Sequence, residues 1–288
     1  MSRNRGRVGT TNKKPDNTEA PVQDLANQAP AAEAAFSFVV PTEFVELPSG
    51  GTLYPEGHPL HGESTIEIKQ MTAKEEDMLT SRALLKKGIA LERVLQSLVC
   101  NKAIDPQTLL LGDKNALVIA TRVSAYGNIY TTEVTCPACD ATQQHSFDLL
   151  ELEARNSNGW EDFDVVENED CTFTTVLPRS KVEVTFKLLT GYDEERISSL
   201  NESDRKRRQE RSVTRQLEGI IVAVNGIEDA KMIRHLVENI PSVDSRHLRS
   251  VYRMAMPNID MSQDFECEEC SHEQEMEVPL TADFFWPQ

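Results

Sequence analysis

Four cysteines stand in two widely separated pairs, and two residues lie between the members of each pair. The pairs are Cys136-Pro-Ala-Cys139 and Cys267-Glu-Glu-Cys270. Two thiolates at this spacing can bind one metal ion, because the tight turn between them points backbone amides toward their negative charge. Two such turns complete a tetrahedral shell of four sulfurs, as in structural zinc sites. We therefore predict that Cys136, Cys139, Cys267 and Cys270 bind one Zn²⁺ that stabilises the fold and takes no part in catalysis.

The residues beside each pair favour a strand, a knuckle and a second strand. Val134 and Thr135 lead into the first turn and residues 144–149 leave it, while Phe265 leads into the second turn and residues 276–280 leave it. This pattern predicts two β-hairpins, the halves of a zinc ribbon. A redox dithiol is the alternative, but a thioredoxin-like motif has one pair at the start of a helix, so two pairs in hairpins favour a metal.

A catalytic zinc is a further alternative, because His61-Gly62-Glu63 precedes the first pair, as in nucleobase deaminases. The match fails in its second half. Pro137 lies inside the pair, and Glu63 lies in a Gly/Pro-rich loop where a helix should present the acid–base group. The sequence has no HExxH motif, phosphate-binding glycine loop or GxSxG elbow. We therefore predict no catalytic residues, no enzyme activity and no small-molecule substrate.

The charge balance is strongly acidic. The 288 residues carry a net charge of −17, which opposes binding to phosphate backbones. After Arg253 the chain has nine acidic residues and no lysine or arginine. The Lys/Arg cluster at 203–211 could contact an acidic partner or nucleic acid, but a solvated helix face is the favoured interpretation. No apolar run has the length of a membrane span and no hydrophobic signal core is present, so we predict a cytoplasmic protein with no membrane partner.

Composition divides the chain into four segments. Residues 1–35 are rich in Asn, Pro, Ala, Gln and Thr, with a basic tip, which predicts a disordered tail. Residues 36–150 hold an N-terminal arm, a first repeat and the first knuckle. Residues 151–174 form an acidic connector. Residues 175–288 hold the second repeat and the second knuckle.

The repeat rests on two similar stretches. Ile66–Ser81 aligns without a gap on Val184–Ser199, and each reads as a strand that runs into a capped helix. Thr72 with Glu75, and Thr190 with Asp193, place a hydroxyl at the helix start and a carboxylate three residues later, where free amides need acceptors.

Later elements follow the same order in the two halves. Apolar residues at helical spacing cover 91–99 and 217–224, and a last helix is expected at 114–125 and at 242–254, just before each knuckle. The sequence therefore predicts an α+β fold of two related strand-plus-helices repeats, joined by a four-cysteine zinc ribbon.

An extended segment precedes the first repeat. It reads Val45-Glu-Leu-Pro-Ser-Gly-Gly-Thr-Leu-Tyr-Pro55. We interpret it as an arm that docks through Leu47, Leu53 and Tyr54 and turns at its glycines.

This arm is one of several segments that resemble the baseplate hub subunit family of T-even-like tailed bacteriophages. The others are IEIKQMTAKEEDMLTSRALL, GDKNALVIATRVSAYG and the pair Cys136 and Cys139, and together they cover about residues 44–150. The resemblance implies a late phage protein needed to build the central hub of the baseplate, as a hub component or an assembly chaperone. The family has no established catalytic residues, and Cys136 and Cys139 are the ligands that it brings.

We therefore predict a non-enzymatic tail-assembly protein that binds other tail or baseplate hub proteins. Its predicted contact residues are those of the arm, namely Leu47, Pro48, Leu53, Tyr54 and Pro55. The protein would act in the host cell cytoplasm, and the sequence leaves open whether it stays in the virion tail. The alternative is a zinc-ribbon regulator that binds RNA polymerase or nucleic acid.

Overall fold

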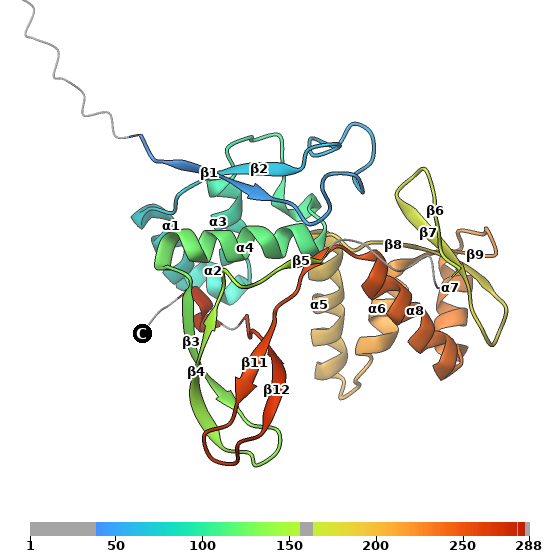
Figure 1. Ribbon diagram of the computed structural model, residues 1–288. Coiled ribbons are helices and arrows are strands. Elements are labelled where there is room, and N and C mark those ends of the chain that lie inside the picture. Colours follow the sequence, from blue (N-terminus) through green and yellow to red (C-terminus); the bar gives the residue numbers. More distant parts are fainter. Residues whose placement is uncertain (1–38, 156–163, 281, 286–288) are drawn as a thin grey trace, which may run out of the picture. The chain divides into compact units, whose positions relative to one another are not determined.

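The computed structural model describes residues 39–155, 164–280 and 282–285, and the chain from Val40 onward forms one compact unit (Figure 1). This part of the chain has eight α-helices and several small antiparallel sheets, which confirms the mixed character of the predicted α+β fold. The predicted disordered tail, residues 1–35, lies outside the described residues.

The first half begins with a hairpin and continues as helices. Its elements are β1 (Thr42–Glu46), β2 (Thr65–Lys69), α1 (Ala73–Thr80), α2 (Arg82–Lys87), α3 (Ala90–Leu98), η1 (Pro106–Thr108) and α4 (Leu111–Tyr126). Strands β1 and β2 are antiparallel, and helix α4 packs against β1. The predicted helices at 91–99 and 114–125 are thus present, as α3 and α4.

The second half is built around a larger sheet. Its elements are β6 (Val166–Glu167), β7 (Thr172–Val176), β8 (Glu183–Lys187), α5 (Gly191–Lys206), α6 (Ser212–Ile220), β9 (Ile221–Val224), α7 (Ala230–Asn239) and α8 (Ser242–Ala255). The strands are antiparallel in the order β6-β7-β8-β9. Strand β6 and the start of β7 fall within the predicted connector at 151–174, of which residues 156–163 lie outside the described residues.

One predicted helix is wrong in its second part. The pattern at 217–224 was helical, but α6 ends at Ile220 and the chain continues as β9. The sequence Ile-Val-Ala-Val at 221–224 is rich in β-branched residues, and it pairs with β8 in a ladder that no local pattern reveals. In the first half only one residue at this place, Val99, forms a bridge, to Ile68 in β2.

The two predicted helix caps are confirmed. Thr72 and Glu75 form a capping box at the start of α1, and Thr190 and Asp193 form one at the start of α5. Each carboxylate also pairs with the last lysine of the preceding strand. Glu75 lies 3.2 Å from Nζ of Lys69, and Asp193 lies 2.7 Å from Nζ of Lys187. The two strand–helix junctions therefore share one local structure.

Two buried aspartates hold the loops of the two hairpins. Asp113, the third residue of α4, accepts hydrogen bonds from the amide and hydroxyl of Ser49, in the loop after β1, at 3.0 and 2.6 Å. Asp244, the third residue of α8, accepts from the amides of Arg179 and Ser180, in the loop after β7, at 2.7 and 2.9 Å. Each half thus closes its hairpin loop onto the start of its last helix.

The segments that lead into α4 and α5 pair with each other. The amide of Leu111 donates to the carbonyl of Leu189, and the amide of Gly191 donates to the carbonyl of Leu109, both at 3.1 Å. Residues of both halves also belong to a single apolar core. Gly112 permits a further close approach, because a Cβ there would stand 1.9 Å from the carbonyl oxygen of Pro257. The halves are therefore packed as one body, and the predicted domain boundaries stay predictions.

Candidate metal centre

Each cysteine pair forms the turn of a β-hairpin, as the sequence predicts. The first hairpin consists of β3 (Ile129–Thr135) and β4 (Thr142–Asp148), and the second of β11 (Ser262–Glu266) and β12 (Glu273–Glu277). The hairpins lie side by side (Figure 1). A short ladder, β5 (Ala154–Arg155) with β10 (Asn258–Ile259), joins the chain just after the first hairpin to the chain just before the second.

The two knuckles have matching backbone geometry. Asp140 donates its amide to the carbonyl of Cys136, and Ser271 donates to the carbonyl of Cys267, both at 2.9 Å. Asp140 and Ser271 have positive φ angles of 58° and 53°, which turn the chain back toward the second strand. The similarity means that both pairs present their sulfurs in the same way.

The four sulfurs come together. All ligand atoms of Cys136, Cys139, Cys267 and Cys270 lie within 4.8 Å of one another. Sγ of Cys136 is 3.8 Å from Sγ of Cys270, and Sγ of Cys139 is 3.7 Å from Sγ of Cys267. A tetrahedral ion with metal–sulfur bonds of about 2.3 Å separates its sulfurs by about 3.8 Å. The cluster could therefore hold one metal ion.

The local electrostatics favour negative charge at one sulfur and resist it at another. The amides of Cys270 and Glu269 lower the pKa of Cys267 to about 7. At Cys139 the amide of Ala141 acts in the same direction, but contacts with the other three sulfurs raise the pKa of this thiol to about 12. Four adjacent thiolates repel one another, so a bound cation is what would allow all four to ionise together.

One side of the cluster is buried and the other is exposed. Cys136 and Cys267 are buried, while Cys139 and Cys270 are exposed. His145 lies on β4, after the first knuckle. Its ring packs edge-on against Phe147 on the same strand and Phe265 on β11, with ring centroids 4.6 and 5.3 Å away. His145 is thus a packing residue between the hairpins, and the cysteine cluster of the described residues does not include it.

Two glutamines that the sequence analysis missed also join the hairpins. The side chain of Gln143 donates to the carbonyl of Glu266 and accepts from the amide of Glu268, at 3.0 and 2.9 Å. From the second hairpin, the side chain of Gln263 donates to the carbonyl of Asp148 and accepts from the amide of the same residue. Glutamines are common on exposed strands, so nothing in the sequence marked these two.

A buried arginine fixes the base of the first hairpin. Arg122 in α4 is 2% exposed and donates to the carbonyls of Gly127, Ile129 and Phe284. These carbonyls belong to the end of α4, the start of β3 and the short helix η3 (Ala282–Phe285). Burial lowers the pKa of Arg122, and the three carbonyls offset part of that desolvation.

The predicted partner-binding arm lies against the chain's own core. Leu47, Pro48, Leu53 and Tyr54 are buried and Pro55 is exposed. The hydroxyl of Tyr54 donates to Asp113 at 2.7 Å and accepts from the amide of Leu110. The predicted docking of Leu47, Leu53 and Tyr54 is therefore an intramolecular contact. Partner binding by these five residues stays a prediction.

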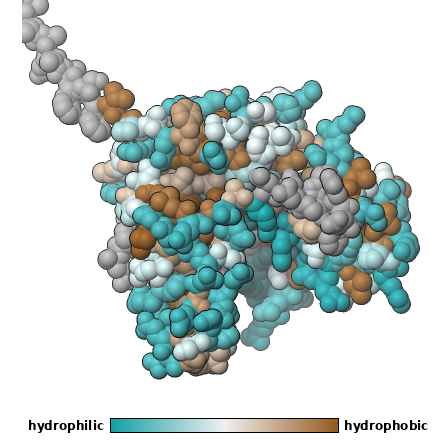
Figure 2. Space-filling view, viewed as in Figure 1, coloured by the Kyte–Doolittle hydropathy of each residue, from teal (hydrophilic) through white to brown (hydrophobic). Residues whose placement is uncertain are grey.

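The acidic surface predicted around the second knuckle is present. Figure 2 shows mainly hydrophilic side chains over the hairpin pair on the face in view. The exposed acidic residues here are Asp264, Glu266, Glu268, Glu269, Glu273, Glu275 and Glu277. No helix in the described part of the chain is long and apolar enough to cross a membrane.

The described chain is thus a mixed α/β body in which two hairpins bring four cysteines together. The chain matches the family described as T4 bacteriophage base plate protein over residues 40–286. It therefore belongs to this family of phage baseplate structural proteins, which confirms the predicted class but not the hub subunit. No curated protein and no solved structure matched the chain.

Proposed function

We propose that this chain is a non-enzymatic component or assembly chaperone of the baseplate central hub, and that one structural Zn²⁺ fastens its two hairpins. The observation that carries the proposal is the family match over residues 40–286, together with the four-cysteine cluster inside that range. Under this proposal the protein acts in the host cytoplasm during tail assembly. Its partners are other tail and baseplate hub proteins.

The zinc part rests on the donor set. Four thiolates in a tetrahedral arrangement suit zinc or iron, and a zinc site with four protein ligands has no open position for a substrate. The two hairpins come from distant parts of the chain and contribute two sulfurs each. A metal here would cross-link residues 136–139 with residues 267–270, so its binding energy would add to the folding energy.

Colour and elemental analysis distinguish zinc from iron at this site. We expect protein purified from cells grown with both metals to be colourless and to contain one zinc per chain by elemental analysis. Removing the metal with a chelator should loosen both hairpins, since each supplies half of the shell. A coloured iron-loaded protein, or a folded and reduced protein without metal, contradicts the zinc proposal.

The repeat supports a structural role. We propose that residues 36–150 and 175–288 are related units. In support, both halves have a hairpin, a capped helix with a lysine–carboxylate pair, a last helix with a buried aspartate at its third position, and a cysteine knuckle. Two linked copies around one metal make a rigid body, which is what an assembly component needs.

The hub role is tested by reconstitution. Co-expression with the phage's other baseplate proteins, followed by size-exclusion chromatography, should give a complex with hub proteins. Mass spectrometry of purified particles then distinguishes a retained component from a chaperone that leaves. Binding to RNA polymerase together with failure to bind any baseplate protein favours the regulator over the hub protein.

We propose that the arm contributes to partner binding mainly by holding the exposed residues around Pro55 in place. Only Pro55 of the five predicted contact residues is exposed, so a partner that binds here would meet Pro55 and its neighbours rather than the buried side chains. Substituting Pro55 should therefore weaken a complex formed through the arm without unfolding the protein.

A further inference from the structure

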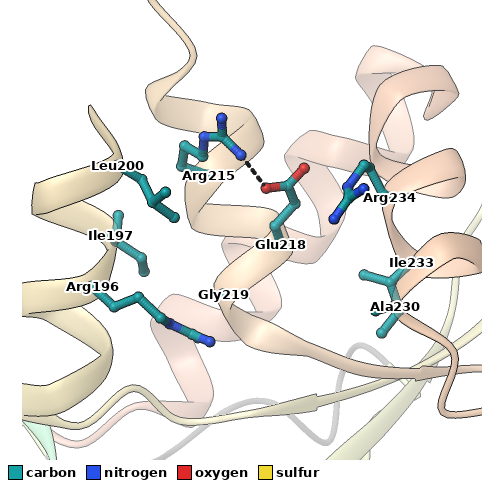
Figure 3. A pocket seen from close by; sticks show the side chains of 9 residues that line it. All are labelled: Arg196, Ile197, Leu200, Arg215, Glu218, Gly219, Ala230, Ile233 and Arg234. Atoms are coloured by element: carbon teal, nitrogen blue, oxygen red, sulfur yellow. Dashed lines mark hydrogen bonds and ion pairs between the residues drawn. The ribbon is translucent and has the colours of Figure 1, made fainter. Parts of the chain in front are cut away.

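A cavity lined by arginines lies among the helices of the second half. It has a volume of about 220 Å³, and its lining comes from α5, α6 and α7 (Figure 3). The floor and walls are largely apolar, with Ile197 from α5 and Ile233 from α7, and Gly219 of α6 between the helices. A Cβ at Gly219 would stand 2.6 Å from Cδ1 of Ile197, so the absence of a side chain there shapes the floor.

The rim of the cavity is rich in arginine although the chain is strongly negative. Arg196, Arg215 and Arg234 line it with a single carboxylate, Glu218, in a chain of net charge −17. The three arginines differ in the ion pairs that they make. Arg215 is held by Asp204 and Glu218, and Arg196 pairs with Asp193 while its side chain remains 59% exposed. Arg234 is exposed and makes no ion pair or hydrogen bond with any residue that the structure describes.

One buried oxygen in the lining also lacks a partner. Glu218 accepts from Arg215 through Oε2 at 2.8 Å, while its Oε1 is buried and has no hydrogen-bond partner among the described residues. A buried carboxylate oxygen without a donor costs free energy. Because this oxygen has almost no accessible surface, an occupant would contact the arginines and the apolar side chains of the lining instead.

We propose that this cavity is a docking site for a short acidic segment of another baseplate protein. The segment would insert one aliphatic side chain between Ile197 and Ile233 and place carboxylates against Arg196 and Arg234. Charge complementarity identifies this occupant, because the rim offers the unpaired guanidinium of Arg234 and the exposed guanidinium of Arg196, and the interior offers apolar contacts. The inference rests on the proposed function only in taking the partner to be a baseplate protein.

The test uses the full chain and a defined probe. The probe is the acetylated and amidated peptide Glu-Asp-Leu-Glu-Asp, and its control carries Ser in place of Leu. Binding is followed through the Cδ1 methyl resonances of ¹³C-labelled isoleucine, with Ile197→Val and Ile233→Val to assign the two signals. We expect both methyls to shift saturably with the Leu peptide, and the Ser peptide to bind about fivefold more weakly.

Matched charge reversals locate the carboxylate contact. Arg234→Glu should weaken the Leu peptide by about fivefold, whereas Arg246→Glu, an exposed arginine on α8 outside the cavity, changes the net charge equally and should have a much smaller effect. Neither side chain is buried, so both variants should fold.

Several outcomes overturn the proposal. If the Leu and Ser peptides bind equally well, no aliphatic side chain is inserted into the cavity. If Arg234→Glu and Arg246→Glu weaken binding equally, the peptide responds only to the net charge of the protein. If sodium phosphate moves the same methyls at the same concentration, the site is an anion site. If the methyls shift with protein concentration alone, the occupant is a second copy of this chain. None of these results bears on the zinc content or on hub binding, so failure here is distinct from failure of the proposed function.

Discussion

The loop after β1 and the loop after β7 are each held by a buried aspartate at the third position of a helix, Asp113 in α4 and Asp244 in α8. Both residues are 0% exposed, but their donors differ. Asp244 receives two backbone amides and the side chain of Ser180, whereas Asp113 receives one amide and the hydroxyls of Ser49 and Tyr54.

The two sets of donors shift the pKa in opposite directions. Burial raises the pKa of Asp113, and the hydrogen bonds from Ser49 and Tyr54 do not reverse this rise. Burial acts in the same direction on Asp244, but the amide of Arg179, the side chain and amide of Ser180 and the nearby His247 together outweigh it and lower the pKa. Two buried carboxylates at the third position of a helix can therefore have pKa values shifted in opposite directions.

The largest expected effect concerns the cysteine cluster, where substitutions in the two knuckles should have equal effects on stability. Cys139→Ser and Cys270→Ser should each lower the free energy of unfolding by several kcal/mol, because each breaks the same four-sulfur shell. The double variant should cost little more than either single variant, since the shell is already lost. Urea unfolding followed by circular dichroism measures all three.

Cys171→Ser serves as the control, because Cys171 lies outside the cluster. Its effect should stay within about 1 kcal/mol. Additive losses at Cys139 and Cys270 would show that the two knuckles act separately and do not share an ion.

The next prediction contrasts the two aspartates at neutral pH. Asp244→Asn should cost about 2 kcal/mol, because two amide donors need two acceptor oxygens and the asparagine NH₂ would face an amide. Asp113→Asn should cost less than about 1 kcal/mol, since the hydroxyls of Ser49 and Tyr54 can rotate and accept from the new NH₂ group. Thermal or urea unfolding of both variants gives the difference, and equal costs would remove the distinction between the two loops.

The strand–helix junctions give a prediction in acid. Burial raises the pKa of Glu75, but hydrogen bonds from Ser97, Thr72 and Lys69 outweigh it and lower the pKa from 4.5 to about 2. A lowered pKa stabilises the fold above the ordinary value, and this contribution is lost as the pH falls from 4.5 toward 2. Its size is on the order of 3 kcal/mol.

The measurement compares wild type with Glu75→Gln between pH 5 and pH 2. The stability difference between them should shrink as the pH falls, and any loss of bound metal affects both proteins alike. Asp193, whose pKa is also lowered, should give the same trend in Asp193→Asn. A pH-independent difference at Glu75 contradicts the prediction.

The last prediction concerns the caps. Thr72→Ala and Thr190→Ala should each cost about 1 kcal/mol, because each removes the hydroxyl of a capping box. Thr80→Ala is a suitable control, since its hydroxyl bonds only to carbonyls of its own helix on the surface. Unequal costs at Thr72 and Thr190 would show that tertiary surroundings outweigh the shared local structure.

Features that depend on neighbours a few residues apart were predictable. The knuckles and the capping boxes at Thr72 and Thr190 join residues separated by three positions, so the sequence displays both partners at once. Helix α4 was predictable because its pattern is long. The strand β9 was not, since Ile221–Val224 fits a helix until β8 is beside it.

Long-range partners account for the rest. Gln143 meets the backbone of Glu266 and Glu268 across more than 120 positions of sequence, and Asp113 meets Ser49 across 64. The arginine cavity likewise forms only when α5, α6 and α7 pack together. The pattern of single side chains carries no information about such partners.

The sequence by itself determined the two cysteine pairs, their hairpin turns and the starts of the capped helices, because short chain segments fix these through local geometry and hydrogen bonding. The tertiary structure alone decided that most of the arm is buried against the chain's own core, and that the pKa of Asp113 is raised while the pKa of Asp244 is lowered. These outcomes depend on which distant groups the burial of the apolar core brings into contact.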